Sequence, residues 1–483
     1  MTHVRAQEPI DIYELLAHED DYPDLDADAA IDHLSRALQC RTVSHVDVSL
    51  TDYAEFDRLH ELIRASYPHL MAAATVETFG HSLLITVPGS DEGLAPVQLM
   101  AHQDVVPVVA GTEGDWTHDP FSGHVDEDFV WGRGALDIKE MLVGELEAVE
   151  YLLARGARPR RTILLAFGED EECLQQGAKR IASALASRGV RLAFLIDEGD
   201  YVVTSGDAYG APGTLFKQVQ LGEKGYCDVR VTAHGAGGHS SQPFGGTSLG
   251  HVCEAVARIA GAPYPARLSP LTHMTLRTLA PHVTQGALAG LLADVDGNAD
   301  EIARVCLVSP ELFSQVTTTI APTMLDGGSQ ASNVMPHDVS AVVNFRLDPG
   351  TSSADVMARC RELTRDLPVE LDWFQDVEEP SPADAGVGVE DNPGYRAIAD
   401  AVARYLRDPT SGTGLPVLPA LATGSTDAHS YEDVCDACLR MCPMVTTHAE
   451  SERGVHGTDE RVTKRAYLQG IRMFVRILEE TCL

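Results

Sequence analysis

The chain has 483 residues, 72 of them acidic and 36 basic, and its formal charge of −36 would repel a polyphosphate backbone. This composition argues against nucleic acid as a partner. The length favours two domains, in tandem or one inserted into the other, and 44% apolar residues with 41 glycines and 26 prolines are typical of a globular α/β protein.

Two features of the sequence bear on cellular location. No uninterrupted apolar run is long enough to span a membrane, and the N-terminal residues lack the apolar core of a secretory signal. We therefore expect a cytoplasmic protein with no membrane partner.

From about residue 82 to 200, short β-rich runs alternate with amphipathic helices. The predicted strands have the sequences SLLITV, VQLMAH, RTILLAF and LAFLID. A helix is expected from about Lys139 to Arg155, because leucine and valine recur there at spacings of four, three and four. This alternation predicts the α/β class, with a mostly parallel sheet flanked by helices.

The pattern changes near Gly222. Period-two alternation in YCDVRVTAHG, a helix from about Ser248 and further alternation in SAVVNFRLDPG predict a separate, partly antiparallel α+β unit. Residues 263–323 are expected to form a loop-and-helix insertion in that unit. A loop should follow at 378–393, then a helix from Gly394 to Leu406 and a terminal helix after Arg461.

Polar side chains follow three of the predicted strands. VQLMAH ends in His102, with Asp104 two residues later, the acidic run 169–172 follows RTILLAF, and LAFLID ends in Asp197, with Glu198 next. In an open α/β sheet, ligands bind at the carboxyl ends of strands. Taken singly, each of these groups is more typical of a chance motif or a solvated loop. Together they predict a metal site, because imidazole and carboxylate suit ions such as zinc and so many carboxylates need cations.

Two other motifs leave alternatives open. Asp137 in WGRGALDIKEML precedes the helix expected at Lys139, where its ordinary role would be to cap that helix. Cys435, Cys438 and Cys442 are spaced like a metal knuckle, but no second pair stands at the matching spacing. We favour buried structural thiols, kept reduced in the cytoplasm.

These motifs, in this order and spacing, resemble the co-catalytic zinc metallopeptidase family that includes aminoacylase, carboxypeptidase S, acetylornithine deacetylase, succinyl-diaminopimelate desuccinylase and carnosinase. The resemblance is closest to carboxypeptidase S. It runs from LSRALQCRTVS near the start to VHGTDERV near the end and includes WTHDPFSGHVDEDFVWGRGALDIK. It implies a di-metal catalytic domain of residues 1–218 and 377–483, with residues 219–376 inserted as a lid and dimerisation domain.

The resemblance also implies the residues of a metal centre. The metal ligands would be His102, Asp137, Glu172, Glu198 and His456. They would hold two zinc ions, with cobalt or manganese as alternatives, and Asp137 would bridge them. Asp197 is the alternative to Glu198.

The catalytic groups follow from the same resemblance. Asp104 would fix the imidazole of His102, and Glu171 would act as general base and then general acid for a metal-bridged hydroxide. His239 in GAGGHSSQP would reach an active site, commonly the partner subunit's, to stabilise the oxyanion. Without the family, His239 would be an exposed histidine in a glycine-rich turn.

Further residues are implied to bind substrate. Asn333 would contact the substrate carbonyl and Arg346 its carboxylate, although an arginine on an alternating strand is more often solvent-facing. The loop GSTDAHSY, with Gly424, Ser425 and Thr426, would line the substrate's C-terminal side.

The sequence departs from the family pattern after the glutamate pair. The family often has a small or glycine-rich stretch there, whereas CLQQ, residues 173–176, precedes Gly177 in this chain. We expect the local loop and the pocket width to differ, and not the metal ligands.

The implied function is metal-dependent hydrolysis of N-acyl amino acids, an aminoacylase-type deacylation of small substrates with a free carboxylate. A carboxypeptidase or dipeptidase is the alternative reading, and a catalytically silent metal-binding scaffold is an alternative of another class. Glu171 discriminates against the scaffold, because a silent relative has no need of a base. The resemblance also implies a homodimer formed through the lid.

Overall fold

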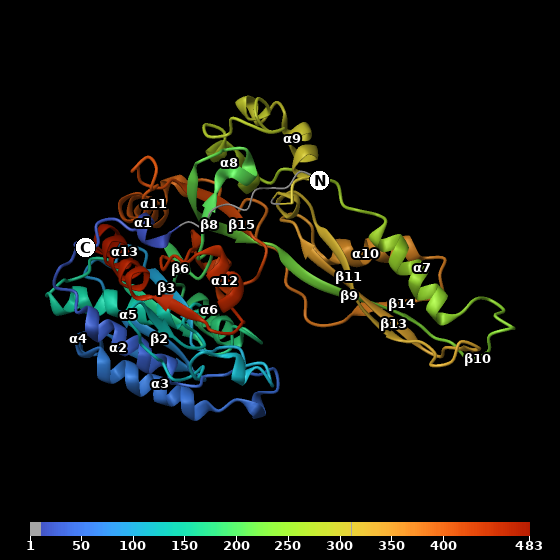
Figure 1. Cartoon of the computed structure of the whole chain (residues 1–483), viewed down its shortest axis with the longest axis horizontal. Coiled ribbons are helices and arrows are strands. Elements are labelled where there is room, and N and C mark those ends of the chain that lie inside the picture. The colour runs from blue at the N-terminus through green and yellow to red at the C-terminus, as the bar shows by residue number, and fades with distance from the viewer. Residues whose placement is uncertain (1–10, 311) are drawn as a thin grey trace.

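The computed structural model describes residues 11–310 and 312–483. They form a rounded body and a long arm that projects from it (Figure 1). We use "arm" for residues 225–262 and 318–377 and "body" for the rest.

The body is built on one large mixed sheet, with the order β1-β2-β5-β3-β6-β16-β8-β15 and β7 paired with β8. From β5 to β16 the neighbouring strands are parallel, whereas β1, β2 and β7 pair antiparallel with their neighbours. The bounds are β1 Thr75–Phe79, β2 Ser82–Val87, β3 Val97–His102, β5 Ile163–Gly168, β6 Phe194–Asp197, β7 Val203–Ser205, β8 Leu215–Glu223, β15 Val417–Ala422 and β16 Cys438–Arg440. The four strands predicted in this region are all present.

The central strands are apolar because helices cover both faces of the sheet. Successive side chains of β3 enter different hydrophobic clusters: Leu99 joins the cluster with α5 and α13, and Met100 joins the cluster with α6. The helices of the body, apart from one segment described below, are α1 Ile12–Leu15, α2 Ala27–Leu38, α3 Tyr53–Ser66, α4 Pro68–Ala73, α5 Lys139–Ala154, α6 Gln176–Ser187, α11 Pro393–Tyr405, α12 His448–Gly454 and α13 Lys464–Cys482. The helices predicted at 139–155, at 394–406 and at the C-terminal end are confirmed. A small sheet joins β4 Phe129–Trp131 to β17 Arg461–Thr463.

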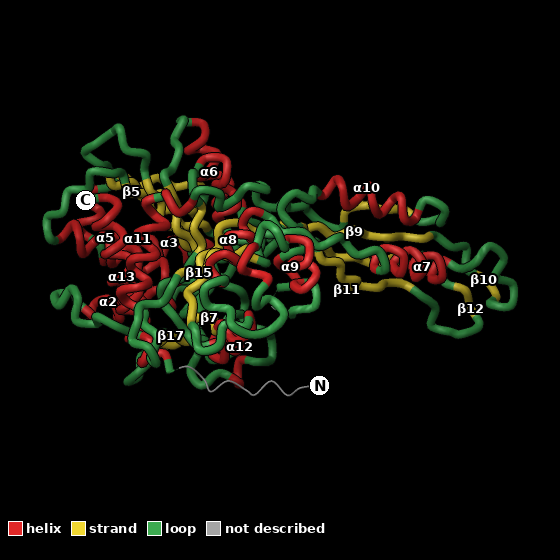
Figure 2. Tube along the Cα trace, turned by 90° about the horizontal axis from the view of Figure 1, so that it is seen from above, coloured by secondary structure: helices red, strands yellow, loops and turns green. Residues whose placement is uncertain are grey.

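The arm contains an antiparallel sheet of order β11-β13-β9-β14 with two helices packed on one face (Figure 2). Alternate residues of β9 are buried, as the period-two pattern predicts. The bounds are β9 Gly225–Ala233, β11 Thr319–Gly327, β13 Val339–Leu347, β14 Glu370–Trp373, α7 Ser248–Ala260 and α10 Ser353–Thr364. At the far tip, β10 Gly238–His239 pairs with β12 Val334–Met335.

The chain enters and leaves the arm at one place. Glu223, the last residue of β8, exchanges hydrogen bonds with Ser381: the Glu223 amide donates to Ser381 Oγ at 2.7 Å, and the Ser381 amide donates to the Glu223 carbonyl at 3.0 Å. Strand β8 thus stays in the large sheet beyond the predicted division at 218/219. The assignment of the two parts to catalytic and lid roles remains a prediction.

The segment predicted as an insertion in the second unit packs on the body. It contains α8 Pro270–Leu279 and α9 Ala299–Cys306, and its last residues belong to β11. Leu279 packs with Phe216 and Leu418 of the large sheet, and Thr275 Oγ1 donates a hydrogen bond to the Pro419 carbonyl at 2.8 Å. Residues 263–317 are therefore joined to the arm in sequence but lie against β8 and β15.

Two further expectations from the sequence concern membrane-spanning segments and the state of the cysteines. None of the helices in the described residues combines the length and hydrophobicity needed to cross a bilayer. All ten cysteines lie in the described part of the chain and are unpaired, and Cys435, Cys438 and Cys442 are buried.

Candidate metal centre

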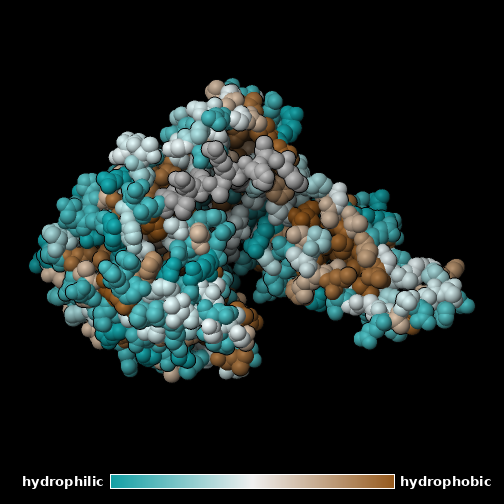
Figure 3. All heavy atoms as spheres, in the orientation of Figure 1, coloured by the Kyte–Doolittle hydropathy of each residue, from teal (hydrophilic) through white to brown (hydrophobic). Residues whose placement is uncertain are grey.

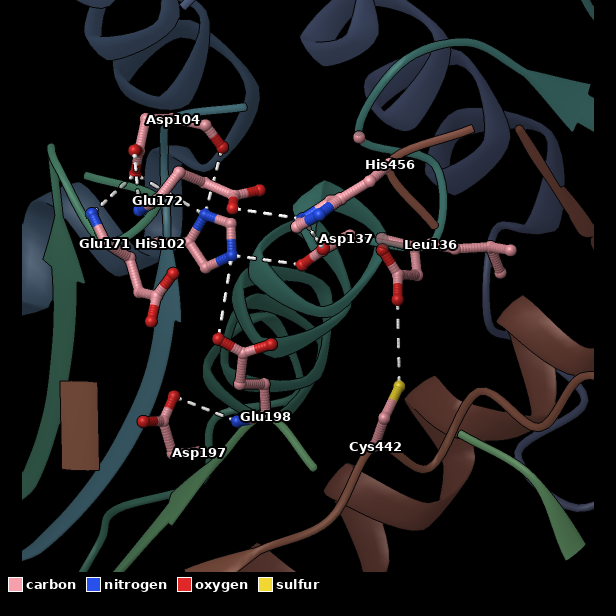
Figure 4. Close-up of polar contacts among 12 residues, drawn as sticks. His102, Asp104, Leu136, Asp137, Glu171, Glu172, Asp197, Glu198, Cys442 and His456 are labelled. Carbon is pink, nitrogen blue, oxygen red and sulfur yellow. Dashed lines mark hydrogen bonds and ion pairs between the residues drawn. The ribbon is translucent and has the colours of Figure 1, made fainter. Parts of the chain in front are cut away.

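Side chains from five segments meet at the carboxyl edge of the large sheet (Figure 4). His102 ends β3, Glu171 and Glu172 lie in the turn after β5, and Glu198 follows β6 directly. Asp137 precedes α5, and His456 follows α12. Two groups within this set each bring three ligand atoms to within 4.8 Å of one another: His102 with Asp137 and Glu172, and His102 with Glu171 and Glu198.

The carboxylate of Asp137 lies between the two histidines. Asp137 Oδ1 is 3.2 Å from His102 Nε2, and Asp137 Oδ2 is 3.1 Å from His456 Nε2. On the outer sides, Glu198 Oε1 lies 3.7 Å from His102 Nε2, and Glu172 Oε2 lies 3.1 Å from His456 Nε2. The arrangement has two halves, each with one imidazole and one glutamate, and Asp137 is shared between them.

Asp137 does not cap the helix that follows it. The N-cap position of α5 is Ile138, and no side chain caps the helix there. The loop before the helix is held by Glu460 instead: Glu460 Oε1 accepts hydrogen bonds from the amides of Leu136 and Asp137, at 2.8 and 3.1 Å, and Oε2 accepts one from Gly134. The Asp137 carboxylate is therefore free to face the histidines.

Asp104 organises the opposite side of His102. The His102 Nδ1 atom lies 2.9 Å from the Asp104 carbonyl and 3.4 Å from its Oδ1. The Asp104 carboxylate also accepts hydrogen bonds from the amides of Glu171 and Glu172, each at 3.1 Å, and from Ser44 Oγ at 2.6 Å. One buried carboxylate thus ties the His102 ring to the turn that carries both glutamates.

Of the two acidic residues at the carboxyl end of β6, Glu198 is the one that faces His102. Asp197 is turned away, because its Oδ1 accepts the Glu198 amide and its Oδ2 accepts the Ala428 amide, at 2.9 and 2.7 Å. Tyr201 donates its hydroxyl to Glu198 Oε2 at 3.1 Å, which leaves Oε1 directed at the imidazole.

The electrostatics of the cluster favour bound cations. Burial raises the pKa of Glu171 and of Glu198 well above the usual value, and neighbouring carboxylates raise both further. Hydrogen bonds to Asp137 and Glu172 raise the pKa of His456 to about 10. Burial would lower the pKa of His102, but its hydrogen bonds to Asp104 and Asp137 raise it well above the usual value. The protein thus gathers more negative charge here than its own groups neutralise.

The donor set fits metal ions. The ion-pair partners of Asp137, Glu172 and Glu198 in the described part of the chain are the two imidazoles. Glu172 Oε1 is buried and has no hydrogen-bond partner. A mixture of imidazole nitrogen and carboxylate oxygen matches zinc, and cobalt or manganese would accept the same set.

The structure does not bring His239 or Asn333 into this cluster. His239 belongs to β10 at the far tip of the arm, is exposed, and accepts a hydrogen bond from the Ser241 amide at 3.1 Å. The Asn333 carbonyl accepts the Ser240 amide at 3.0 Å, so Asn333 lies beside His239. The two predicted residues are therefore neighbours, away from the metal cluster of their own chain.

Arg346 and the loop after β15 form a second group where the arm joins the body. The Arg346 guanidinium lies 4.6 Å from the Tyr226 ring centroid and donates a hydrogen bond to the Thr423 carbonyl at 3.3 Å, next to Gly424 and Ser425. The Thr426 hydroxyl is buried and donates to Glu223 Oε1 at 2.6 Å. Within the loop, Thr426 is therefore engaged by the protein itself, whereas Gly424 is exposed and Ser425 is partly exposed.

Three residues around the site, Ser44, Tyr201 and Glu460, were given no role from the sequence, and a fourth, Asp427, was placed only in the substrate loop GSTDAHSY. Glu460 and Ser44 hold the Asp137 loop and Asp104, and Tyr201 orients Glu198. Asp427 is buried, and the charges of Asp197 and His102 act on its pKa, which burial raises well above the usual value. Glu460 lies within VHGTDERV, four positions after the predicted ligand His456, which is a weak signal. Ser44 and Asp427 lie in LSRALQCRTVS and GSTDAHSY, which do not indicate these contacts, and Tyr201 lies in no motif.

Comparison with known proteins identifies relatives along most of the chain. The family model described as "Peptidase family M20/M25/M40" matches residues 98–480. The "N-fatty-acyl-amino acid synthase/hydrolase PM20D1.1" of Danio rerio is 31% identical over 461 residues, which cover 93% of this chain and 85% of that protein. "Probable carboxypeptidase S-like 2" of Dictyostelium discoideum is 28% identical and covers 96% of this chain and 87% of its own.

A solved structure agrees in fold. The M20 family metallo-carboxypeptidase Sso-CP2 from Sulfolobus solfataricus superposes with a TM-score of 0.66, at 15% identity, over 94% of this chain and 99% of that one. At this identity the likeness concerns the fold alone.

Proposed function

This chain belongs to peptidase family M20/M25/M40 and is a hydrolase of peptide or amide bonds, and we propose that it deacylates N-acyl amino acids. The observation that carries the proposal is the position of Asp137, whose two carboxylate oxygens face His102 and His456 at 3.2 and 3.1 Å. A carboxylate between two ligand pairs suits a two-metal amide hydrolase.

The metal cofactor would be two zinc ions. His102 and Glu198 would hold one, His456 and Glu172 the other, and Asp137 would bridge them. When bound, such ions lower the pKa of water and polarise the substrate carbonyl. Asp104 would keep the His102 ring oriented, in the way that residues behind metal ligands commonly do. Cobalt or manganese is the alternative to zinc.

Glu171 would carry the proton. Its carboxylate lies on the His102 and Glu198 side of the cluster, where a positioned carboxylate can take a proton from water and pass it on. Glu171 would take the proton from the attacking water as the water adds to the amide carbonyl. It would then deliver that proton to the nitrogen as the C–N bond breaks, so that one residue serves both steps.

The substrate's carboxylate would bind at Arg346. A guanidinium can donate two parallel hydrogen bonds to a carboxylate, and the Tyr226 ring keeps that of Arg346 in place beside Gly424 and Ser425. Relatives named as N-fatty-acyl-amino acid synthase/hydrolases support N-acyl amino acids as the substrate class. The expected products are a free amino acid and a carboxylic acid.

His239 and Asn333 would act in a second copy of the chain. Both lie at the tip of the arm. One edge of the arm's sheet is strand β11, in which Met324 is 52% exposed and Leu325 is 62% exposed. Exposed apolar side chains on an edge strand favour pairing with another strand. Hydrophobic residues also gather on the visible face of the arm (Figure 3). We expect a homodimer in which each arm tip supplies His239 to the other catalytic domain.

A carboxypeptidase or dipeptidase is the second candidate, supported by the relative named carboxypeptidase S-like. The same groups would hydrolyse a C-terminal peptide bond. In a peptide, as in an N-acyl amino acid, the nitrogen of the reacting amide belongs to an amino acid that carries a free carboxylate. The presence of Glu171 argues against a silent scaffold. A cytoplasmic location also remains a prediction.

A substrate screen tests the proposal. The purified protein would be assayed against N-acyl amino acids of increasing acyl length and against dipeptides, with and without a chelator. We expect N-acyl amino acids to be cleaved fastest, activity to be lost on chelation and restored by zinc, and metal analysis to give two ions per chain. Activity that ignores the chelator would refute the metal mechanism, and a preference for dipeptides would favour the second candidate.

A further inference from the structure

Gln175 contacts the candidate general base. It lies in the turn between β5 and α6, in the CLQQ segment where the chain departs from its expected family pattern. Its side-chain amide Nε2 donates a hydrogen bond of 2.9 Å to Glu171 Oε1. The segment that departs from the family pattern therefore supplies a polar side chain that hydrogen-bonds to Glu171.

The backbone of Gln175 adopts a conformation that glycine would take more readily. Its φ is +52°, in the left-handed region, where the Cβ atom of any other residue is crowded by the backbone. Residues held in such conformations tend to cluster at functional sites. A glycine here would satisfy the turn but would remove the contact with Glu171.

The start of α6 does not require the Gln175 side chain. Gln175 occupies the N-cap position, yet its side chain makes no capping hydrogen bond. Asp170 fills that role instead, accepting the amides of Gln176 and Gly177 at 3.1 and 2.7 Å. The Gln175 amide group is thus free to serve Glu171.

We propose that Gln175 is a positioning residue that holds Glu171 in its working rotamer. The inference rests on the proposed role of Glu171 as the base. With Oε1 engaged by the amide, the other oxygen of Glu171 is left to accept the proton of the attacking water. Because an amide donates this hydrogen bond without being a base, Gln175 can fix the carboxylate without competing for that proton.

Two substitutions separate the contact from the backbone turn. Gln175→Gly keeps the turn and removes the side chain. Gln175→Asn also suits the left-handed conformation and keeps an amide, but it is one methylene shorter and falls short of Glu171. Gln176→Ala is the matched control, because the Gln176 side chain is exposed and its Nε2 donates only to the Leu174 carbonyl among the described residues.

The measurements are kcat, KM, bound metal and Tm, together with crystal structures of the wild type and Gln175→Gly. We expect kcat to fall about tenfold in both Gln175 variants, with KM, metal content and Tm retained and the control unchanged. In the Gln175→Gly crystal, Glu171 should occupy more than one rotamer. Wild-type kcat in either variant, or a loss of kcat that follows a loss of metal or Tm, would overturn the proposal.

The crystallographic comparison keeps this test separate from the proposed function. If the wild type hydrolysed none of the screened substrates, the deacylase proposal would fail. The position of Glu171 in the two crystals would still decide whether Gln175 holds it, and an identical single rotamer in both would overturn the inference.

Discussion

Glu460 accepts a hydrogen bond from the amide of Asp137 at 3.1 Å, so a residue 323 positions later in the chain holds the loop that presents the shared carboxylate. The same glutamate forms a buried ion pair with Arg133, with 2.5 Å between Oε2 and Arg133 Nη1. The C-terminal segment thus contributes both His456 and the support for Asp137.

Removal of the Glu460 carboxylate should destabilise the protein strongly. Glu460→Ala would leave Arg133 buried without its partner, which costs about 3 to 5 kcal/mol in the free energy of unfolding. Glu362→Ala is the control, because its ion pair with Arg365 is exposed and worth about 0 to 1 kcal/mol. Urea unfolding measures both, and equal losses in the two variants would contradict the role given to Glu460.

Glu171→Gln should abolish turnover without disturbing the site. The amide cannot accept the proton of water, so kcat should fall by about 10² to 10⁴-fold, while metal content and Tm stay at wild-type values. Glu92→Gln serves as the control, because Glu92 is exposed in the loop between β2 and β3. Substantial residual activity in Glu171→Gln would show that another group is the base.

Arg346→Ala should discriminate against substrates that have a free carboxylate. Loss of a charge-assisted hydrogen bond costs about 1.5 to 3 kcal/mol, so kcat/KM for an N-acyl amino acid should fall roughly ten- to hundredfold. The amidated form of that substrate should be cleaved equally by the two proteins. Arg230→Ala is the matched control, since Arg230 also lies over an aromatic ring of the arm, that of Phe374. An equal loss on both substrates would argue against carboxylate binding.

His239 should act on the partner's site. Glu171→Gln and His239→Ala are each expected to be nearly inactive. A mixed dimer would contain one site with an intact base and an intact partner His239, so mixing the variants should restore roughly a quarter of wild-type activity. Activity after subunit exchange is the measurement, with the molecular mass in solution as a check on dimer formation. No recovery from a verified mixed dimer would place His239 outside the reaction.

Lys224 should make stability depend on pH in the alkaline range. It is buried where the chain enters the arm, its Nζ donates to the carbonyls of Ser314 and Thr317, and burial lowers its pKa to about 8. Between pH 8 and 10.5 the unfolded chain therefore binds more protons than the folded one, and stability rises with pH. From pH 8 to 10 the wild type should gain about 2 kcal/mol relative to Lys224→Met.

The control for this titration is Lys179→Met, at an exposed lysine on α6. It should follow the wild type at both values of pH in urea unfolding. A Lys224→Met profile parallel to that of the wild type would mean that the Lys224 ammonium is solvated in the folded protein.

Local sequence patterns predicted the elements that surround the site. The strands that deliver His102 and Glu198 are mostly apolar and fully buried, and apolar residues recur at helical spacing in α5. These signals arise from burial, which acts on each element separately. Strand β16 has only three residues and escaped notice, although it lies between β6 and β8. The order of strands in a sheet cannot be predicted from the residues of any single strand.

The sequence was less informative where long-range contacts decide the geometry. Asp137 has the position of a helix cap, and its side chain is freed only because Glu460 binds the loop. The preference of His102 for Glu198 over Asp197 depends on the Ala428 amide. The packing of α8 on β15 likewise contradicts the order of the chain, which places α8 between strands of the arm.

The strand order has a consequence for synthesis of the protein. Strand β16 and helix α13 come from the last tenth of the chain, yet one fills the middle of the sheet and the other packs on α5. Until they leave the ribosome, one edge of β6 and the side of α5 that packs on α13 are uncovered, and such surfaces favour aggregation. A nascent chain would thus need protection, for example by a chaperone, until its final helix has emerged.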